Sequence, residues 1–145
     1  MFKLILEFYL TLIIPLIYIL GLIIISLSPN NIKYTPSTIL GLITTLFGLL
    51  LWTWVYFTLR FSLTVLPKAK KLVTTGPYKY FSHPMYLGII LTFLGLSLAT
   101  SSIPGFFYTI FIIFPLNLFR AKTEEKKLLE EFDKKYEEYK KKVLF

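Results

Sequence analysis

The sequence predicts an all-α integral membrane protein with about four transmembrane helices and a C-terminal amphipathic helix on the cytosolic side. Of its 145 residues, 55% are hydrophobic and 18% aromatic, and the mean hydropathy is +0.66, a composition typical of membrane proteins. Three uncharged runs, residues 8–27, 38–59 and 84–119, reach or exceed the roughly 20 residues that cross a bilayer. Because they leave no room for a soluble catalytic domain, we expect a single domain over residues 1–145, with two spans in residues 1–66.

The first two uncharged runs each predict one span. Residues 8–27 end at the polar turn formed by residues 28–31, which breaks a helix. No small-residue cleavage site precedes a polar segment there, so we expect a retained span and not a removed signal peptide. Residues 38–59 form the second span, with Trp52, Trp54 and Tyr56 toward its far end, as is typical of a membrane interface.

The third run, residues 84–119, is too long for one span. A single helix of this length would extend about 54 Å, against a hydrocarbon core of roughly 30 Å. The polar and Pro-Gly residues 100–105 predict a turn, which gives a short helical hairpin of spans Met85–Ala99 and Phe106–Phe119. A re-entrant hairpin is the alternative.

Residues 67–145 would hold this hairpin, the loop before it and a charged tail. From Arg120 onward the chain becomes charged, with apolar and aromatic residues recurring every three or four positions, which predicts an amphipathic helix. These residues are Leu128, Leu129, Phe132, Tyr136, Tyr139 and Val143. We expect the helix to dock on the membrane or on the preceding loop.

The distribution of charge orients the chain. Its formal net charge is +8, and the positive residues collect beside the apolar runs, which favours anionic lipid over nucleic acid as a partner. Residues 60–83 carry five basic residues and no acid, whereas residues 28–37 carry only Lys33. Both termini and the second loop are therefore predicted to be cytosolic, in a multi-pass protein. A prokaryotic plasma membrane is our favoured location because the chain is minimal, although this topology fits the endoplasmic reticulum equally.

Few side chains could perform chemistry. The absence of cysteine excludes thiol nucleophiles and thiolate metal sites, and His83 with Glu124 and Glu125 is too thin a set to predict a metal. The helix start at Ser82-His83-Pro84 could hold a carboxylate or phosphate, or His83 could simply be a polar cap. Arg120 and Glu124 share a helix face. They could form an ion pair, or Glu124 could bind a ribose, amine or cation while Arg120 holds an anion.

Several of these motifs occur together in one known family. The blocks Leu72-Val73-Thr74-Thr75-Gly76-Pro77-Tyr78 and His83-Pro84-Met85-Tyr86-Leu87-Gly88, then Arg120 with Glu124-Glu125, then Phe132 and the Tyr136, Tyr139 and Val143 tail resemble the isoprenylcysteine carboxyl methyltransferase family. These integral-membrane enzymes use S-adenosylmethionine and are related to phospholipid N-methyltransferases. The resemblance covers residues 68–143. The chain departs from the family at Ser82, where Arg is common, and at Asp133, where Gly is usual.

The resemblance implies a cofactor site and an acceptor site. By motif position, S-adenosylmethionine would contact Lys71, Leu72, Val73, Tyr78, His83, Pro84, Met85, Tyr86, Glu124 and Glu125, with Lys71 at the edge of its block. Arg120 would be the catalytic and substrate-binding arginine, suited to an anionic acceptor. The resemblance implies carboxyl O-methylation of an isoprenylcysteine-like lipophilic acceptor. Phospholipid or amine N-methylation is the alternative, and a non-enzymatic four-span scaffold is a further one. The sequence does not determine the oligomeric state.

Overall fold

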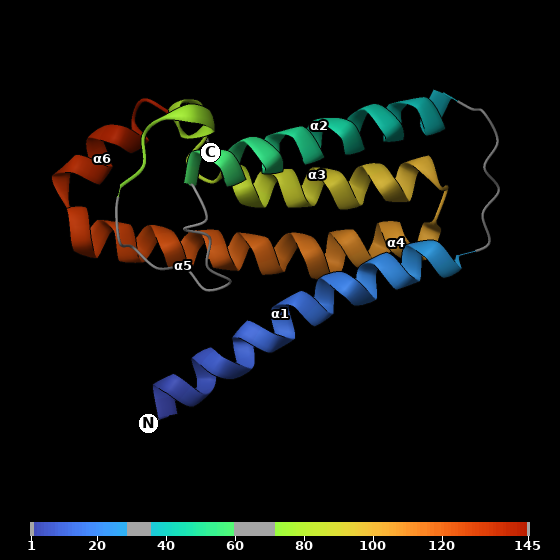
Figure 1. The fold of residues 1–145 in the computed structure, drawn as a ribbon, viewed down its shortest axis with the longest axis horizontal. Coiled ribbons are helices and arrows are strands. Elements are labelled where there is room, and N and C mark those ends of the chain that lie inside the picture. The colour runs from blue at the N-terminus through green and yellow to red at the C-terminus, as the bar shows by residue number, and fades with distance from the viewer. Residues whose placement is uncertain (1, 29–35, 60–71, 145) are drawn as a thin grey trace.

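The computed structural model of the protein describes residues 2–28, 36–59 and 72–144 (Figure 1). These segments are helical and contain no strand, with one isolated bridge between Phe81 and Leu144. The all-α class predicted from the sequence is therefore confirmed. In chain order, the helices are α1 (Phe2–Leu27), α2 (Pro36–Leu59), the 3₁₀ helix η1 (Gly76–Lys79), α3 (Pro84–Ala99), α4 (Ile103–Tyr108), the π-helical segment η2 (Thr109–Ile113), α5 (Phe114–Phe132) and α6 (Lys134–Lys140).

Two of these helical rods are long and apolar enough to cross a membrane. They are α2 and the continuous run Ile103–Phe132, while Thr11–Leu27 and Pro84–Ala99 are shorter apolar helices. Only a third or less of each long rod's most apolar window is buried in the protein. Large apolar side chains such as Ile43, Phe47 and Leu50 point outward instead. An exposed apolar surface of this extent suits contact with lipid and not with water.

The bundle is held together most tightly between α2 and α3, which lie side by side (Figure 1). The buried face of α2 consists of small and apolar residues at spacings of three and four, namely Thr38, Gly41, Thr45, Gly48, Leu51 and Val55. A Cβ atom added at Gly41 would lie 2.3 Å from the backbone nitrogen of Ala99, and one at Gly95 would lie 2.4 Å from that of Thr45. Small residues thus let the two backbones touch, as in packed membrane helices.

The predicted hairpin turn is present, and the helix after it extends beyond the apolar run. Helix α3 stops at Ala99, and Ser102 caps α4 by accepting a hydrogen bond from the backbone of Gly105 at 3.0 Å. The predicted span Phe106–Phe119 and the start of the charged tail form one continuous rod, which runs to Phe132. Helical hydrogen bonding does not depend on side-chain polarity, so the rod continues past the apolar run for about 20 Å.

The charged tail is two helices and not one. Helix α5 ends at Phe132, and α6 begins at Lys134 and turns back toward η1 (Figure 1). The break lies at Asp133, whose φ of 43° and ψ of −120° are not helical. The expectation of one uninterrupted amphipathic helix is therefore wrong. The reversal brings Tyr136 and Tyr139 into contact with the protein, and both are buried.

Asp133 occupies a backbone conformation that favours glycine, the residue usual at this position in the family it resembles. A positive φ crowds the Cβ of any other residue. We expect Asp133→Gly to raise the free energy of unfolding by about 1 kcal/mol, measured by thermal or denaturant unfolding in detergent. Asp133→Ala is the control, because it removes the charge and keeps the Cβ. A gain of equal size in both variants would contradict the backbone explanation.

Candidate active site

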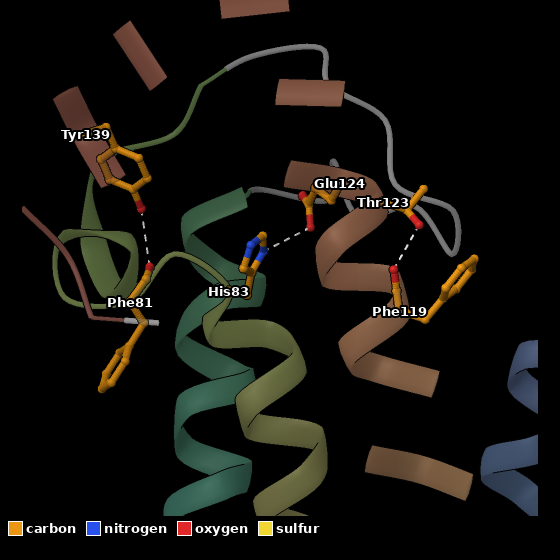
Figure 2. Close-up of polar contacts among 6 residues, drawn as sticks. All are labelled: Phe81, His83, Phe119, Thr123, Glu124 and Tyr139. Atoms are coloured by element: carbon orange, nitrogen blue, oxygen red, sulfur yellow. Dashed lines mark hydrogen bonds and ion pairs between the residues drawn. The ribbon is translucent and has the colours of Figure 1, made fainter. Parts of the chain in front are cut away.

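The start of α3 meets the middle of α5 at the end of the bundle where η1 and α6 lie (Figure 1). His83 precedes Pro84, the first residue of α3, and its Nδ1 lies 3.5 Å from Oε2 of Glu124 (Figure 2). This separation is longer than that of a well-formed hydrogen bond. The His83 nitrogens and the hydroxyl of Ser82 are buried, and the described residues provide them with no hydrogen-bond partner.

Tyr86 and Arg120 complete the same cluster. Tyr86 is 2% exposed and Arg120 is 5% exposed, and the guanidinium carbon lies 4.9 Å from the centre of the Tyr86 ring. This is the geometry of a cation–π contact. The Tyr86 hydroxyl also interacts with the Glu124 carboxylate. We call His83, Tyr86, Arg120 and Glu124 the site cluster. All four are residues that the sequence predicts for the site, and the structure brings them together.

Two further polar residues, Tyr18 and Asn117, hold Arg120 in place through hydrogen bonds. Its Nη1 donates a hydrogen bond to the Tyr18 hydroxyl at 2.9 Å, and Tyr18 donates to Oδ1 of Asn117 at 2.8 Å. Sequence reasoning missed both partners. Asn117 gave a signal, because a lone amide inside an apolar run is unusual and often functional. Tyr18 gave none, since a tyrosine near a predicted span is ordinary.

The C-terminal segment closes over the loop that carries His83. The Tyr139 hydroxyl of α6 donates a hydrogen bond to the backbone oxygen of Tyr78 at 2.6 Å. The same hydroxyl lies 3.3 Å from the backbone oxygen of Phe81 (Figure 2). The backbone of Leu144 pairs with Tyr80 and Ser82 at 2.8 and 3.2 Å. These contacts join the C-terminal segment to the loop before α3, so α6 fixes this loop in place beside α3.

The other predicted site residues have different surroundings. Pro84 is buried, and Val73, Tyr78 and Met85 are half-buried. Glu125 forms an ion pair with Lys140 of α6, which ties α5 to α6. Lys71 lies outside the residues that the structure describes.

Leu72 lines a separate groove of about 510 Å³ between the loop and α6. The other lining residues are Thr74, Lys79, Lys135, Glu138, Tyr139, Lys142 and Val143. None of the site cluster lines this groove. The site cluster is the better candidate for chemistry because its polar groups are buried and converge, whereas the groove is open and lined by surface lysines.

Burial keeps the tyrosines around the site protonated. It raises the pKa of Tyr78, and the nearby Glu124 carboxylate and Tyr139 add to the effect. Burial likewise raises the pKa of Tyr136 and of Tyr139 to about 12 in each case. The Glu124 carboxylate contributes to all three shifts, since a second negative charge beside it is unfavourable.

These shifts predict a loss of stability at alkaline pH. A tyrosine in an unfolded chain ionises near pH 10, whereas folded Tyr136 and Tyr139 ionise at about 12. The folded state holds these protons more tightly, so their contribution is complete below about pH 10 and is lost as the pH rises to about 12. We expect the unfolding midpoint to fall over this interval, together with the appearance of tyrosinate absorbance.

Tyr136→Phe is the matched variant for this measurement. The Tyr136 side chain is fully buried, and its hydroxyl finds no hydrogen-bond partner in the described part of the chain. The variant should therefore keep its stability at neutral pH and lose less of it on alkalinisation. An alkaline fall identical to that of the wild type would show that Tyr136 does not contribute to it.

Comparison with known proteins identifies the family. The family described as phospholipid methyltransferase matches residues 36–135, a range that includes α2 and the whole site cluster. The chain belongs to this family. The protein-S-isoprenylcysteine O-methyltransferase of Saccharomyces cerevisiae is 33% identical to it over 111 residues, which cover 73% of this chain and 46% of the yeast protein. The chain thus spans about half the length of this curated relative. No solved structure matches the chain.

Family membership agrees with the fold. The phospholipid methyltransferase match and the two long apolar rods make this protein membrane-associated. The match ends at residue 135, just after the break at Asp133, and begins at residue 36, so α1 lies outside it. The isoprenylcysteine carboxyl methyltransferase resemblance seen in the motifs is confirmed by the yeast relative.

Proposed function

We propose that the protein transfers a methyl group from S-adenosylmethionine to a lipophilic acceptor at the membrane, by carboxyl O-methylation of an isoprenylcysteine-like compound. The observation that carries this proposal is the site cluster. It combines a buried cation, Arg120, and a carboxylate, Glu124, on adjacent turns of α5. Both lie against the buried His83, which precedes α3, and the buried Tyr86 of α3. Burying charged groups at the end of an apolar bundle lowers the stability of the fold, so such groups mark functional sites.

The residues present fit S-adenosylmethionine. The buried hydroxyl of Ser82 and the His83 nitrogens have no hydrogen-bond partner among the described residues, and buried polar groups of this kind are normally satisfied. A ligand with hydroxyl, amine and carboxylate groups could satisfy them. Glu124 could hold a ribose hydroxyl or the amine of such a ligand. The half-buried Tyr78 and Met85 add an aromatic and an apolar surface nearby. When bound, S-adenosylmethionine supplies an electrophilic methyl group on a sulfonium.

The protein's own residues would position the acceptor and exclude water. Arg120 presents a planar guanidinium, which can hold a carboxylate through two parallel hydrogen bonds. A carboxylate acceptor is already ionised at neutral pH, so no general base is required. Tyr139 and the backbone of Leu144 fix the loop beside α3 and help to exclude water from the reacting groups.

Amine methylation of a phospholipid is the second candidate, favoured by the family description that matches residues 36–135. In this case Glu124 would attract an ammonium group in place of Arg120 holding a carboxylate. The amine would have to lose a proton before attack, because a protonated nitrogen has no free electron pair. The two candidates therefore differ in their pH dependence as well as in their acceptors.

We further propose that the chain crosses the membrane four times, with the site and both termini in the cytosol of a prokaryotic cell. Four apolar helical stretches support this arrangement, namely α2, Ile103–Phe132 and the shorter Thr11–Leu27 and Pro84–Ala99. The collection of basic residues in residues 60–83 supports it as well. The chain has no cysteine, so single-cysteine variants can report orientation. We expect Lys126→Cys to react with impermeant reagents from the cytosolic side and Ile103→Cys from the opposite side. Reaction of both from one side would contradict the four-span topology.

The activity is tested with purified protein in detergent or lipid vesicles. Binding of S-adenosylmethionine and of its demethylated product is measured first, followed by transfer of labelled methyl groups to prenyl-cysteines and to phospholipids. Saturable binding with transfer to a prenyl-cysteine supports the proposal, and transfer only to phospholipid supports the second candidate. If folded protein binds neither compound with lipid present, the methyltransferase proposal fails and a non-enzymatic scaffold takes its place.

A further inference from the structure

Helix α1 contributes a residue to the site although it lies outside the family match. That match begins at residue 36, yet the hydroxyl of Tyr18 accepts a hydrogen bond from Arg120 at 2.9 Å, across 102 positions of sequence. The Tyr18 ring also packs against Phe93 of α3, with ring centres 5.9 Å apart. Tyr18 is therefore fixed by packing on one side and by hydrogen bonds on the other.

The hydrogen bonds around Tyr18 form a chain with one direction. Asn117 is fully buried, and its Nδ2 donates to the backbone oxygen of Ile113 at 2.8 Å, which leaves Oδ1 as an acceptor. Tyr18 has one hydroxyl proton and gives it to this Oδ1 at 2.8 Å. The oxygen of Tyr18 can then only accept, and it accepts from Arg120. Arg120 Nη1, the Tyr18 hydroxyl and Asn117 Nδ2 thus donate in turn to Tyr18, Asn117 and Ile113, and we call these four residues the relay.

This relay determines where the guanidinium lies. Arg120 is 5% exposed, in contact with the Tyr86 ring on one side and hydrogen-bonded to Tyr18 on another. Tyr18 and Asn117 are uncharged, so they orient the guanidinium through hydrogen bonds alone. A guanidinium held in a defined orientation is suited to bind an anionic group through parallel hydrogen bonds.

We propose that Tyr18 and Asn117 are positioning residues that aim Arg120 at the anionic group of the acceptor. This inference rests on the proposed function, in which Arg120 holds the acceptor. It assigns to α1 a role in acceptor specificity and not in cofactor binding. Loss of a hydrogen bond to a charged group is large enough to lower kcat/KM for the acceptor by about tenfold.

The test uses Tyr18→Phe, which removes the hydroxyl and keeps the ring that packs on Phe93. We expect kcat/KM for a prenyl-cysteine carboxylate to fall by about tenfold, with the affinity for S-adenosylmethionine changed by less than about twofold. Tyr108→Phe is the matched control. Its hydroxyl donates to the backbone of Ile17 at 2.9 Å, so it loses a hydrogen bond to α1 without touching Arg120. Equal effects in both variants, or equal losses of cofactor affinity and kcat/KM in Tyr18→Phe, would overturn the proposal.

A readout independent of activity separates this inference from the proposed function. The unfolding midpoints of Tyr18→Phe, Arg120→Met, which removes the donor, and the double variant form a double-mutant cycle. If the relay exists, the double variant loses less than the sum of the single losses. Additive losses would overturn the relay even if methyl transfer is found. If the wild type does not bind S-adenosylmethionine but the losses are still non-additive, the hydrogen bond between Tyr18 and Arg120 stands. The proposed function and the acceptor role of Tyr18 would then be overturned.

Discussion

Replacing Glu124 by glutamine is expected to weaken binding of S-adenosylmethionine by about 10- to 100-fold, the range of a lost hydrogen bond to a charged group. Glu124 is the carboxylate at the centre of the site, 3.5 Å from the ring of His83 and in contact with Tyr86. Glutamine keeps the shape of the side chain and removes only its charge. Titration calorimetry or equilibrium dialysis in detergent measures the affinity.

The matched control for this variant is Glu130→Gln, an exposed acid on the same helix. It removes the same charge from α5 and should leave the affinity within about twofold, as expected of an exposed surface acid. Unchanged affinity in Glu124→Gln would show that Glu124 does not bind the cofactor. A similar loss in both variants would show that the net charge of α5 matters, and not the site cluster.

Replacing Gly95 by alanine is expected to have the largest effect on stability, a loss of about 3 kcal/mol. The added Cβ would lie 2.4 Å from the backbone nitrogen of Thr45 and 2.7 Å from the backbone oxygen of Gly41. Backbone atoms cannot rotate away as side chains do, so α2 and α3 must separate. Because α3 carries Tyr86 and begins directly after His83, we expect cofactor affinity to fall together with the unfolding midpoint.

Gly21→Ala is the matched control for this substitution. Its Cβ would also be crowded, at 2.8 Å from Phe93 and 3.0 Å from Tyr108, but both neighbours are side-chain ring atoms. These rings can shift at a smaller cost, so the loss of stability should be less than half that of Gly95→Ala. Equal losses would show that the crowding of the added methyl group, and not the contact between backbones, decides the stability.

The positions of the helices could be predicted from local sequence alone. The uncharged run 38–59 became α2, Pro36–Leu59, and the run after Pro84 became α3, ending at Ala99 as expected. Both predictions rest on nearby residues, since a span needs a minimum apolar length and Pro, Gly and Ser mark the turns. The end of α5 could not be predicted in this way, because this helix continues without a break from apolar into charged residues.

Part of the site could also be predicted locally. Arg120 and Glu124 are four residues apart on one helix, so a shared face follows from helical geometry. The position of His83 beside Pro84 marked the start of α3. The same spacing argument could not separate Glu124 from Glu125, and only the return of α6 at Asp133 shows that Glu125 faces Lys140.

The sequence by itself determined the class of the protein, the approximate helix positions and the four residues of the site cluster, because each follows from a short apolar run or from a motif. Only the tertiary structure decided that His83 meets Glu124 and that Tyr18 holds Arg120. These pairs depend on how closely α2 and α3 approach and on which buried polar groups must find partners in an apolar bundle. Both conditions involve residues far apart in the chain, and no local pattern records them.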